Sequence, residues 1–135
     1  MGQFDMTVAE AFTPYVFPQE TGNRSEVRWA ALLDAVGDGF LIRGLPEVNV
    51  SAWPYSQEDI SKARHTSELP KRDFLTLNID RAQMGLGGDD SWSPNGWPHP
   101  EYMIPAGPVS YRFSLRAVKG MSAEKPFLPF RLEGE

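Results

Sequence analysis

The chain has 135 residues, 41% of them hydrophobic, and a net charge of −5 at pH 7, which is enough material for one domain with its own core. The negative charge and the lack of a lysine- or arginine-rich run argue against nucleic acid as a partner, and no apolar stretch is long enough to predict a membrane-spanning helix. There is no cysteine, so disulfides are excluded and a zinc site is disfavoured.

Residues 1–13 carry little pattern and are expected to be an inter-domain connector or an artificial start of the chain. Beyond them, short apolar or alternating segments separated by glycine and proline predict β-strands. These segments are residues 15–17, 26–33, 40–43, 47–52, 74–80 and 109–118. Before the fifth of them, Ser56 and Asp59 have the spacing of a helix-capping box, and Pro70 forbids a longer helix, so one short helix is predicted there.

Together these elements predict an all-β fold, an antiparallel β-sandwich with one short helix. The twelve prolines and twelve glycines fit such a fold, because it needs many turns between short strands. The sandwich domain is expected over residues 14–118. Residues 119–135 are expected to form a C-terminal tail with no assigned role.

A glycine-rich loop follows the fifth predicted strand and reads Met-Gly-Leu-Gly-Gly-Asp-Asp-Ser-Trp-Ser-Pro over residues 84–94. Glycines allow backbone angles closed to other residues, and aspartates in such a loop accept hydrogen bonds from the neighbouring backbone. The residues expected to support the loop are Gly87, Gly88, Asp89, Asp90 and Ser91. The two aspartates are also conceivable calcium ligands, but the EF-hand pattern is absent, so anchoring is favoured and no metal site is predicted.

Trp92, which this loop carries, is the strongest candidate for a binding residue. An aromatic ring can cover the C–H face of a sugar, and desolvating ~60 Å² at about 25 cal/mol per Å² contributes roughly 1.5 kcal/mol. The competing interpretation is a core residue, the role expected of Trp29 and Trp53, which lie in strand-like segments. Trp97 follows an Asn-Gly turn signal and is a candidate second aromatic at the same rim.

Several segments occur in the order and spacing found in the last domain of one enzyme family. They are Pro-Tyr-Val-Phe-Pro-Gln-Glu-Thr-Gly-Asn-Arg at 14–24, Val-Arg-Trp at 27–29, Trp-Pro-Tyr-Ser at 53–56, Ala-Arg-His-Thr-Ser-Glu-Leu-Pro at 63–70, Leu-Asn-Ile-Asp at 77–80, the glycine-rich loop, and Tyr-Arg-Phe-Ser-Leu at 111–115. The ordered set resembles the C-terminal domain, or small chain, of bacterial β-galactosidases of glycoside hydrolase family 2. The resemblance runs from about Pro14 to Ala117.

The resemblance implies a fold for this domain and places the catalytic residues in another domain. The domain would be the C-terminal half of a galactose-mutarotase-like β-supersandwich, while the catalytic glutamates of the family lie in a (β/α)8 barrel. The chain is therefore expected to hold no catalytic residue and to be inactive alone. The tryptophan of the loop, here Trp92, would form an apolar platform for the sugar at the mouth of the active site. The family does not regularly place a tryptophan at the position of Trp97.

The resemblance also implies the partners. These are the catalytic barrel of the parent chain or subunit and a β-galactoside such as lactose, with neither nucleic acid nor membrane. No cofactor is expected here, because the Mg²⁺ and monovalent cation that the family often uses would be bound by other domains. A stand-alone galactoside-binding module and a purely structural domain stay open as alternatives. Any targeting signal is expected upstream of this segment, which leaves both the cytoplasm and the periplasm open.

Overall fold

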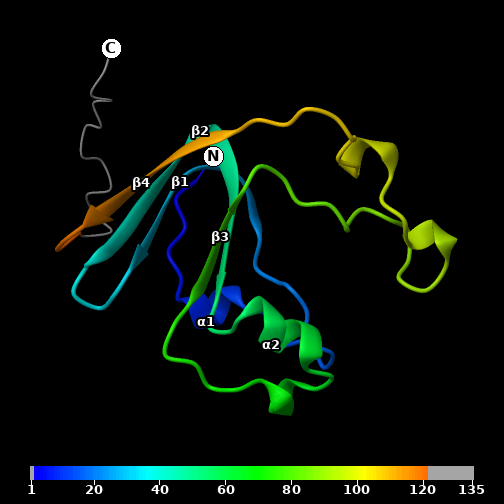
Figure 1. Cartoon of the computed structure of the whole chain (residues 1–135), viewed down its shortest axis with the longest axis horizontal. Helices are drawn as coiled ribbons and strands as arrows, with labels where there is room; N and C mark the ends of the chain where they lie inside the picture. The colour runs from blue at the N-terminus through cyan, green and yellow to red at the C-terminus, as the bar shows by residue number, and fades with distance from the viewer. Residues whose placement is uncertain (1, 122–135) are drawn as a thin grey trace.

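The computed structural model describes residues 2–121, and its elements are labelled in Figure 1. In chain order they are α1 (Val8–Ala11), β1 (Arg24–Leu33), β2 (Gly39–Trp53), α2 (Gln57–Lys62), the 3-10 turn η1 (Thr66–Glu68), β3 (Thr76–Asp80), the 3-10 turns η2 (Pro94–Gly96) and η3 (Pro100–Tyr102), and β4 (Arg112–Val118). Within this range no helix has the length and apolar character needed to cross a membrane. The tail expected over residues 119–135 lies outside the described residues from 122 onward.

All four strands belong to one antiparallel sheet in which β2 is the common partner. β1 pairs with one edge of β2. On the other edge, β4 pairs with the first part of β2, where Leu115 lies opposite Ile42, and β3 pairs with the second part, where Asn78 lies opposite Ser51. The prediction of an all-β antiparallel fold with a short capped helix is confirmed.

β2 joins two of the predicted strands, and it bends where they meet (Figure 1). The pairing of β1 with β2 skips residues 44–47. Gly44 is required at this bend, because a Cβ there would lie 2.5 Å from the Cα of Glu47. A second register shift on β1 holds Glu26 in the left-handed region, at φ 56, which is typical of a β-bulge. The bend divides the sheet into two arms.

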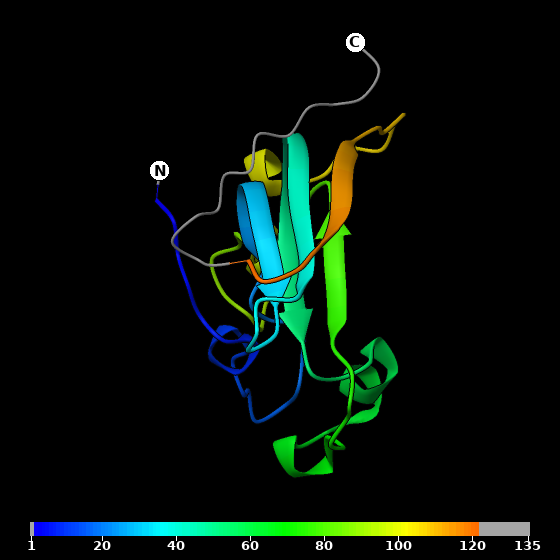
Figure 2. The same ribbon diagram turned by 90° about the vertical axis from the view of Figure 1, so that its left-hand side faces the viewer.

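A cluster of buried side chains lies where α1 and α2 meet the end of β2. Both helices lie at the same end of the sheet in the two views of Figures 1 and 2. Trp53 is 1% exposed and packs with Phe12 and Ile60, and the ring of Tyr55 meets that of Phe12 edge-on at 5.3 Å. The prediction that Trp53 is a core residue is confirmed, whereas Trp29 is only half-buried.

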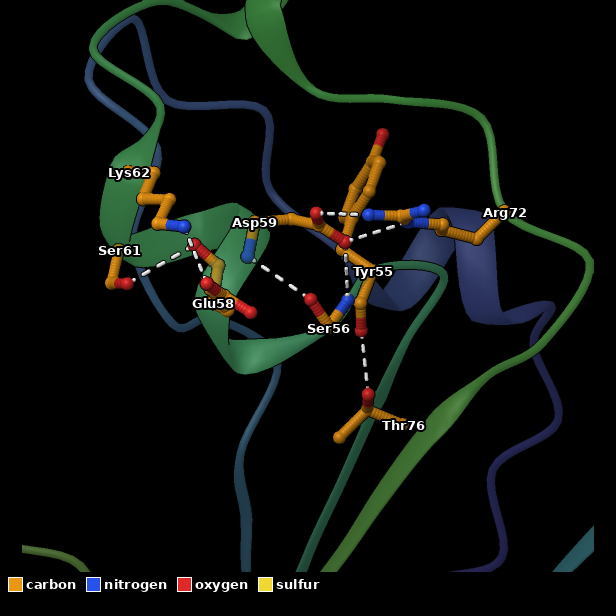
Figure 3. Close-up of polar contacts among 8 residues, drawn as sticks. All are labelled: Tyr55, Ser56, Glu58, Asp59, Ser61, Lys62, Arg72 and Thr76. Atoms are coloured by element: carbon orange, nitrogen blue, oxygen red, sulfur yellow. Dashed lines mark hydrogen bonds and ion pairs between the residues drawn. The ribbon is translucent and has the colours of Figure 1, made fainter.

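Helix α2 begins at the predicted capping box (Figure 3). The Asp59 amide donates to Ser56 Oγ over 3.0 Å, and the Ser56 amide donates to Asp59 Oδ2 over 2.9 Å. Arg72 completes the site by donating through Nε to Oδ2 (2.9 Å) and through Nη2 to Oδ1 (2.5 Å) of Asp59. The Arg72 guanidinium, followed by the Ser56 amide, holds the pKa of Asp59 well below its usual range. The pair ties α2 to the segment that leads into β3.

One predicted strand is wrong. Residues 15–17 form no ladder, and Tyr15 uses its carbonyl to accept a hydrogen bond of 2.8 Å from the Thr66 hydroxyl. Pro14 and Pro18 flank the segment, and proline cannot donate to a strand ladder. The segment therefore lies alongside η1 as an irregular connection.

One face of the sheet exposes large apolar side chains. Phe40, Phe113 and Leu115 are all exposed. Leu115 is paired directly with the buried Ile42, and Phe113 with Gly44, so these side chains share one face of the β2–β4 ladder. An apolar sheet face of this kind is typical of a surface that another part of a protein covers.

The Asp59–Arg72 pair should make the stability of the fold depend on pH. Folding lowers the pKa of Asp59 below its unfolded value of about 3.9. The ionised pair therefore stabilises the folded chain above that pH, and this contribution is lost as the pH falls toward the lowered folded value. Between about pH 5 and pH 3, the melting temperature of the wild type should fall more steeply than that of Asp59→Asn, which has no carboxyl group to protonate.

Asp73→Asn is the matched control. Asp73 is an exposed carboxylate close to Arg72, and its substitution leaves the Asp59–Arg72 pair intact. This variant should keep the wild-type pH dependence. Equal slopes for the wild type and Asp59→Asn would contradict the stabilising role of the pair.

Candidate functional site

The candidate site is the long connection between β3 and β4, residues 81–111, which extends away from the sheet (Figure 1). Its two ends are both anchored on β2, since Asp80 pairs with Asn49 and Arg112 pairs with Leu45. The connection contains the predicted glycine-rich loop and the turns η2 and η3. What this connection can bind depends on how its backbone is ordered and which side chains it exposes.

Asp90 organises the segment that carries Trp92. Its Oδ1 accepts hydrogen bonds from the backbone amides of Trp92 (3.1 Å) and Ser93 (2.9 Å), and its Oδ2 accepts one from the Ser93 hydroxyl (2.5 Å). The Ser93 oxygen in turn accepts from the Asn95 amide over 3.1 Å and so caps η2. The hydrogen bond from the Ser93 hydroxyl, and after it the one from the Ser93 amide, lower the pKa of Asp90. The ionised carboxylate thus fixes the backbone on both sides of the Trp92 side chain.

Asp89 closes the loop from its other end. Its carboxylate lies 2.8 Å from Nε2 of His99, and its amide donates to the Asn95 carbonyl over 2.8 Å. The His99 amide donates to the Gly87 carbonyl over 3.0 Å. The carboxylate of Asp89 raises the pKa of His99, so this pairing stabilises the loop below the ordinary pKa of histidine and is lost as the pH rises through the raised value. No role was predicted for His99, because no local sequence pattern predicts a contact across ten residues.

Two glycines allow the loop to pack closely. Gly87 has φ 95, and a Cβ there would run into the ring of Tyr102. A Cβ on Gly88 would run into the carbonyl oxygen of Gly96. Both positions therefore need the absence of a side chain, and the first also needs the left-handed backbone that glycine adopts readily.

The loop presents two tryptophans to solvent. Trp92 is 86% exposed and Trp97 is 72% exposed. Trp97 is one wall of an open hollow of about 400 Å³, and Ser91 and Ser93, the neighbours of Trp92, also line it. The full lining is Met84, Gly85, Ser91, Ser93, Gly96, Trp97 and Pro98. The side chains of this lining are all uncharged and combine aromatic and apolar surface with two hydroxyl groups.

The acidic side chains of the described residues lie apart from one another or are engaged in local hydrogen bonds. Among residues 2–121, no group of three or more histidine, aspartate or glutamate side chains lies close enough to hold a metal ion. Both carboxylate oxygens of Asp90 and Oδ1 of Asp89 form hydrogen bonds within the loop, as anchoring requires. Wherever a shift is resolved for a described carboxyl group, its pKa is lowered, as for Glu10, Glu58, Asp59, Glu68 and Asp90.

Asp90→Ala should loosen the loop without unfolding the sheet, because the bonds that it removes are all within residues 90–93. Amide hydrogen exchange at Trp92 and Ser93 should become several-fold faster, while β2 keeps its protection. Ser91→Ala is the matched control, since the described structure assigns no hydrogen bond to the Ser91 side chain. Unchanged exchange in Asp90→Ala, or the same acceleration in Ser91→Ala, would rule out Asp90 as the organising residue.

Comparison with known proteins identifies relatives across most of the chain. The family described as Beta galactosidase small chain matches residues 1–116. A beta-galactosidase from Priestia megaterium is 45% identical over 98 residues, which cover 73% of this chain and 9% of that protein. Beta-galactosidase BgaC from Bifidobacterium adolescentis is 40% identical over 121 residues, covering 86% of this chain and 11% of that protein.

A third relative is a beta-galactosidase from Lactobacillus delbrueckii subsp. bulgaricus, which is 42% identical over 106 residues, covering 78% of this chain and 10% of that protein. The chain therefore spans about a tenth of the length of the curated relatives that it matches. On the extent of the family match and these identities, the chain belongs to the beta-galactosidase small chain family.

Proposed function

We propose that this chain is the C-terminal domain of a glycoside hydrolase family 2 β-galactosidase that cleaves terminal β-D-galactosides such as lactose. The relatives are named beta-galactosidases and are about ten times as long as the matched segment, which leaves ample chain for a catalytic barrel. The domain completes the active site and does not carry out the chemistry. The observation that carries this proposal is Trp92, a large ring held out from the protein by an ordered loop.

Trp92 acts as a platform for the sugar at the mouth of the active site. A ring that is 86% exposed gains little for folding, so its value lies in what it contacts. The backbone around it is held by Asp90, so only the side-chain torsions of Trp92 remain to be fixed when a ligand binds. Covering ~60 Å² of sugar C–H surface contributes roughly 1.5 kcal/mol, which corresponds to about tenfold in affinity.

The exposed sheet face favours a part of a larger protein over a free-standing module. Phe40, Phe113 and Leu115 would be covered by the preceding half of a galactose-mutarotase-like supersandwich or by the barrel domain. The same surface would serve the purely structural alternative, but that alternative gives no reason for an ordered loop that presents a tryptophan outward.

The isolated 135-residue chain should not hydrolyse an aryl β-galactoside. It lacks the two glutamates that the family carries in its barrel domain. The measurement is a release assay on the purified chain, with a mock purification from the same host as the control for host enzyme. Activity that follows this chain through purification and is absent from the mock would contradict the proposal.

In the full-length parent enzyme, Trp92→Ala should weaken galactoside binding more than folding. We expect KM to rise about tenfold through loss of roughly 1.5 kcal/mol of apolar contact. The kcat/KM value should also fall, because part of the contact persists in the transition state. Trp92→Phe should retain part of the binding contribution of the ring, since a smaller ring still covers part of the sugar. Steady-state kinetics and a thermal melt of each variant are the measurements.

Val36→Ala is the matched control, because Val36 is an exposed apolar residue in the turn between β1 and β2, far along the chain from the loop. It should leave KM unchanged. If Trp92→Ala behaves like Val36→Ala, or if it acts only by lowering the melting temperature, the loop is structural and the platform role is wrong.

A further inference from the structure

We infer that Asn95 is a covalent modification site, at which the side-chain amide is hydrolysed to a carboxylate without the help of another enzyme. The reaction is the deamidation of an Asn-Gly pair through a cyclic imide, with water as the only co-reactant. Its products place an aspartate or an isoaspartate at position 95, in the turn η2. The inference concerns the covalent state of the loop and does not depend on the role proposed for Trp92.

Gly96 makes the first step of the reaction possible. In that step the Gly96 amide nitrogen loses its proton and attacks the side-chain carbonyl carbon of Asn95, and the Nδ2 group leaves as ammonia. Water then opens the five-membered imide at one of its two carbonyl carbons, which gives aspartate or isoaspartate. A following glycine favours the attack, because it has no Cβ to shield its nitrogen and it leaves the backbone free to turn.

The other asparagines of the chain provide an internal comparison. There are four in all, and only Asn95 is followed by glycine. Asn49 is 7% exposed, and the side chains of Asn23 and Asn78 donate to serine hydroxyls over 3.3 and 3.2 Å. Asn95, by contrast, is exposed, and within the described structure no hydrogen bond is assigned to its side-chain amide. Its side chain can therefore turn toward the Gly96 amide.

The turn η2 controls when the attacking nitrogen becomes available. The Gly96 amide donates to the Ser93 carbonyl over 2.9 Å, and the Asn95 amide donates to Ser93 Oγ over 3.1 Å. Ser93 is itself bound by Asp90 through both its amide and its hydroxyl. The Gly96 nitrogen can attack only when its own bond opens, so the rate of modification follows the local opening of the turn. Asp90 slows the reaction because it holds Ser93 in place.

Both products add a negative charge close to two existing carboxylates. The Asn95 carbonyl accepts a hydrogen bond of 2.8 Å from the Asp89 amide. A Cβ on Gly96 would lie 3.6 Å from Oδ1 of Asp90. A carboxylate at position 95 is therefore repelled by those of Asp89 and Asp90, and the loop loses part of its order.

Isoaspartate has the larger effect, because its main chain runs through the side chain and is one atom longer. A Cβ on Gly88 would run into the Gly96 carbonyl oxygen and would lie 2.9 Å from that of Asn95. The opposite half of the loop therefore leaves no room for an added atom in η2. We expect the isoaspartate form to lose this contact, together with the 3.3 Å bond from the Trp97 amide to the Pro94 carbonyl.

The test is incubation of the full-length parent enzyme in mildly alkaline buffer, followed by trypsin digestion and mass spectrometry. The tryptic peptide 82–112 contains Asn95 as its one asparagine, and fragmentation of the peptide locates any change of mass. A sample digested before incubation corrects for modification during the digestion. Asn95→Gln is the matched variant, because glutamine keeps the amide but cannot close the five-membered ring.

We expect peptide 82–112 to gain one dalton at Asn95 and to separate by chromatography into aspartate and isoaspartate forms. The peptides that hold the other three asparagines should stay unchanged, as should Asn95→Gln. Conversion should be faster at higher pH, because the attacking amide must lose a proton. It should be several-fold faster in Asp90→Ala, while Ser91→Ala matches the wild type.

The same enzyme unfolded in urea is the positive control for the chemistry. An unmodified Asn95 in the folded enzyme, under conditions that convert it in urea, would overturn the inference, and so would equal conversion at the other three asparagines. Equal rates in Asp90→Ala and the wild type would reject the control by η2. In the isoaspartate form, amide hydrogen exchange at Trp97 should be several-fold faster than before incubation, and unchanged exchange would contradict the expected loss of order.

Discussion

The arrangement of the site depends on a topological constraint: β3 and β4 pair with the same edge of one bent strand, β2. The connection between them therefore leaves β2 opposite Asn49 and returns opposite Leu45, only four positions away along that strand. Residues 81–111 must therefore form a long loop whose two ends lie close together. Closing a loop of that length costs conformational entropy, and local bonds within the loop must offset the further cost of ordering it.

Those local bonds explain which residues the loop uses. Asp90 satisfies two backbone amides beside Trp92, and Asp89 pairs with His99 on the returning half. Gly87 and Gly88 let the two halves approach without side chains between them. Large apolar side chains are usually buried, but those of Trp92 and Trp97 are exposed to solvent. The polar groups of the loop therefore hold its backbone in place, and its two tryptophan rings stay exposed.

The features that could be predicted from sequence are those set by neighbours along the chain. The capping box of Ser56 and Asp59 depends on residues three apart, and it is found as predicted. The burial of Trp53 follows from its place in an apolar strand. The glycine-rich loop was predicted from its glycines and aspartates, and the outward position of its tryptophan from those residues together with the family resemblance.

The features that were missed depend on distant parts of the chain. The Asp89–His99 pair spans ten residues, and the hollow at Trp97 needs Met84 from the opposite half of the loop. The joining of two predicted strands into β2 depends on how β1 accommodates residues 44–47. The prolines beside residues 15–17 removed the backbone donors that a strand there would need.

A crystal structure of the full-length parent enzyme with a bound galactoside tests the platform role most directly. The proposal predicts that the ring of Trp92 lies in van der Waals contact, about 4 Å, with the C–H face of a sugar unit of the bound galactoside at the mouth of the barrel. It also predicts that the Asp90 bonds to Trp92 and Ser93 persist. A structure in which Trp92 packs against protein, and no part of the ligand contacts its ring, would contradict it.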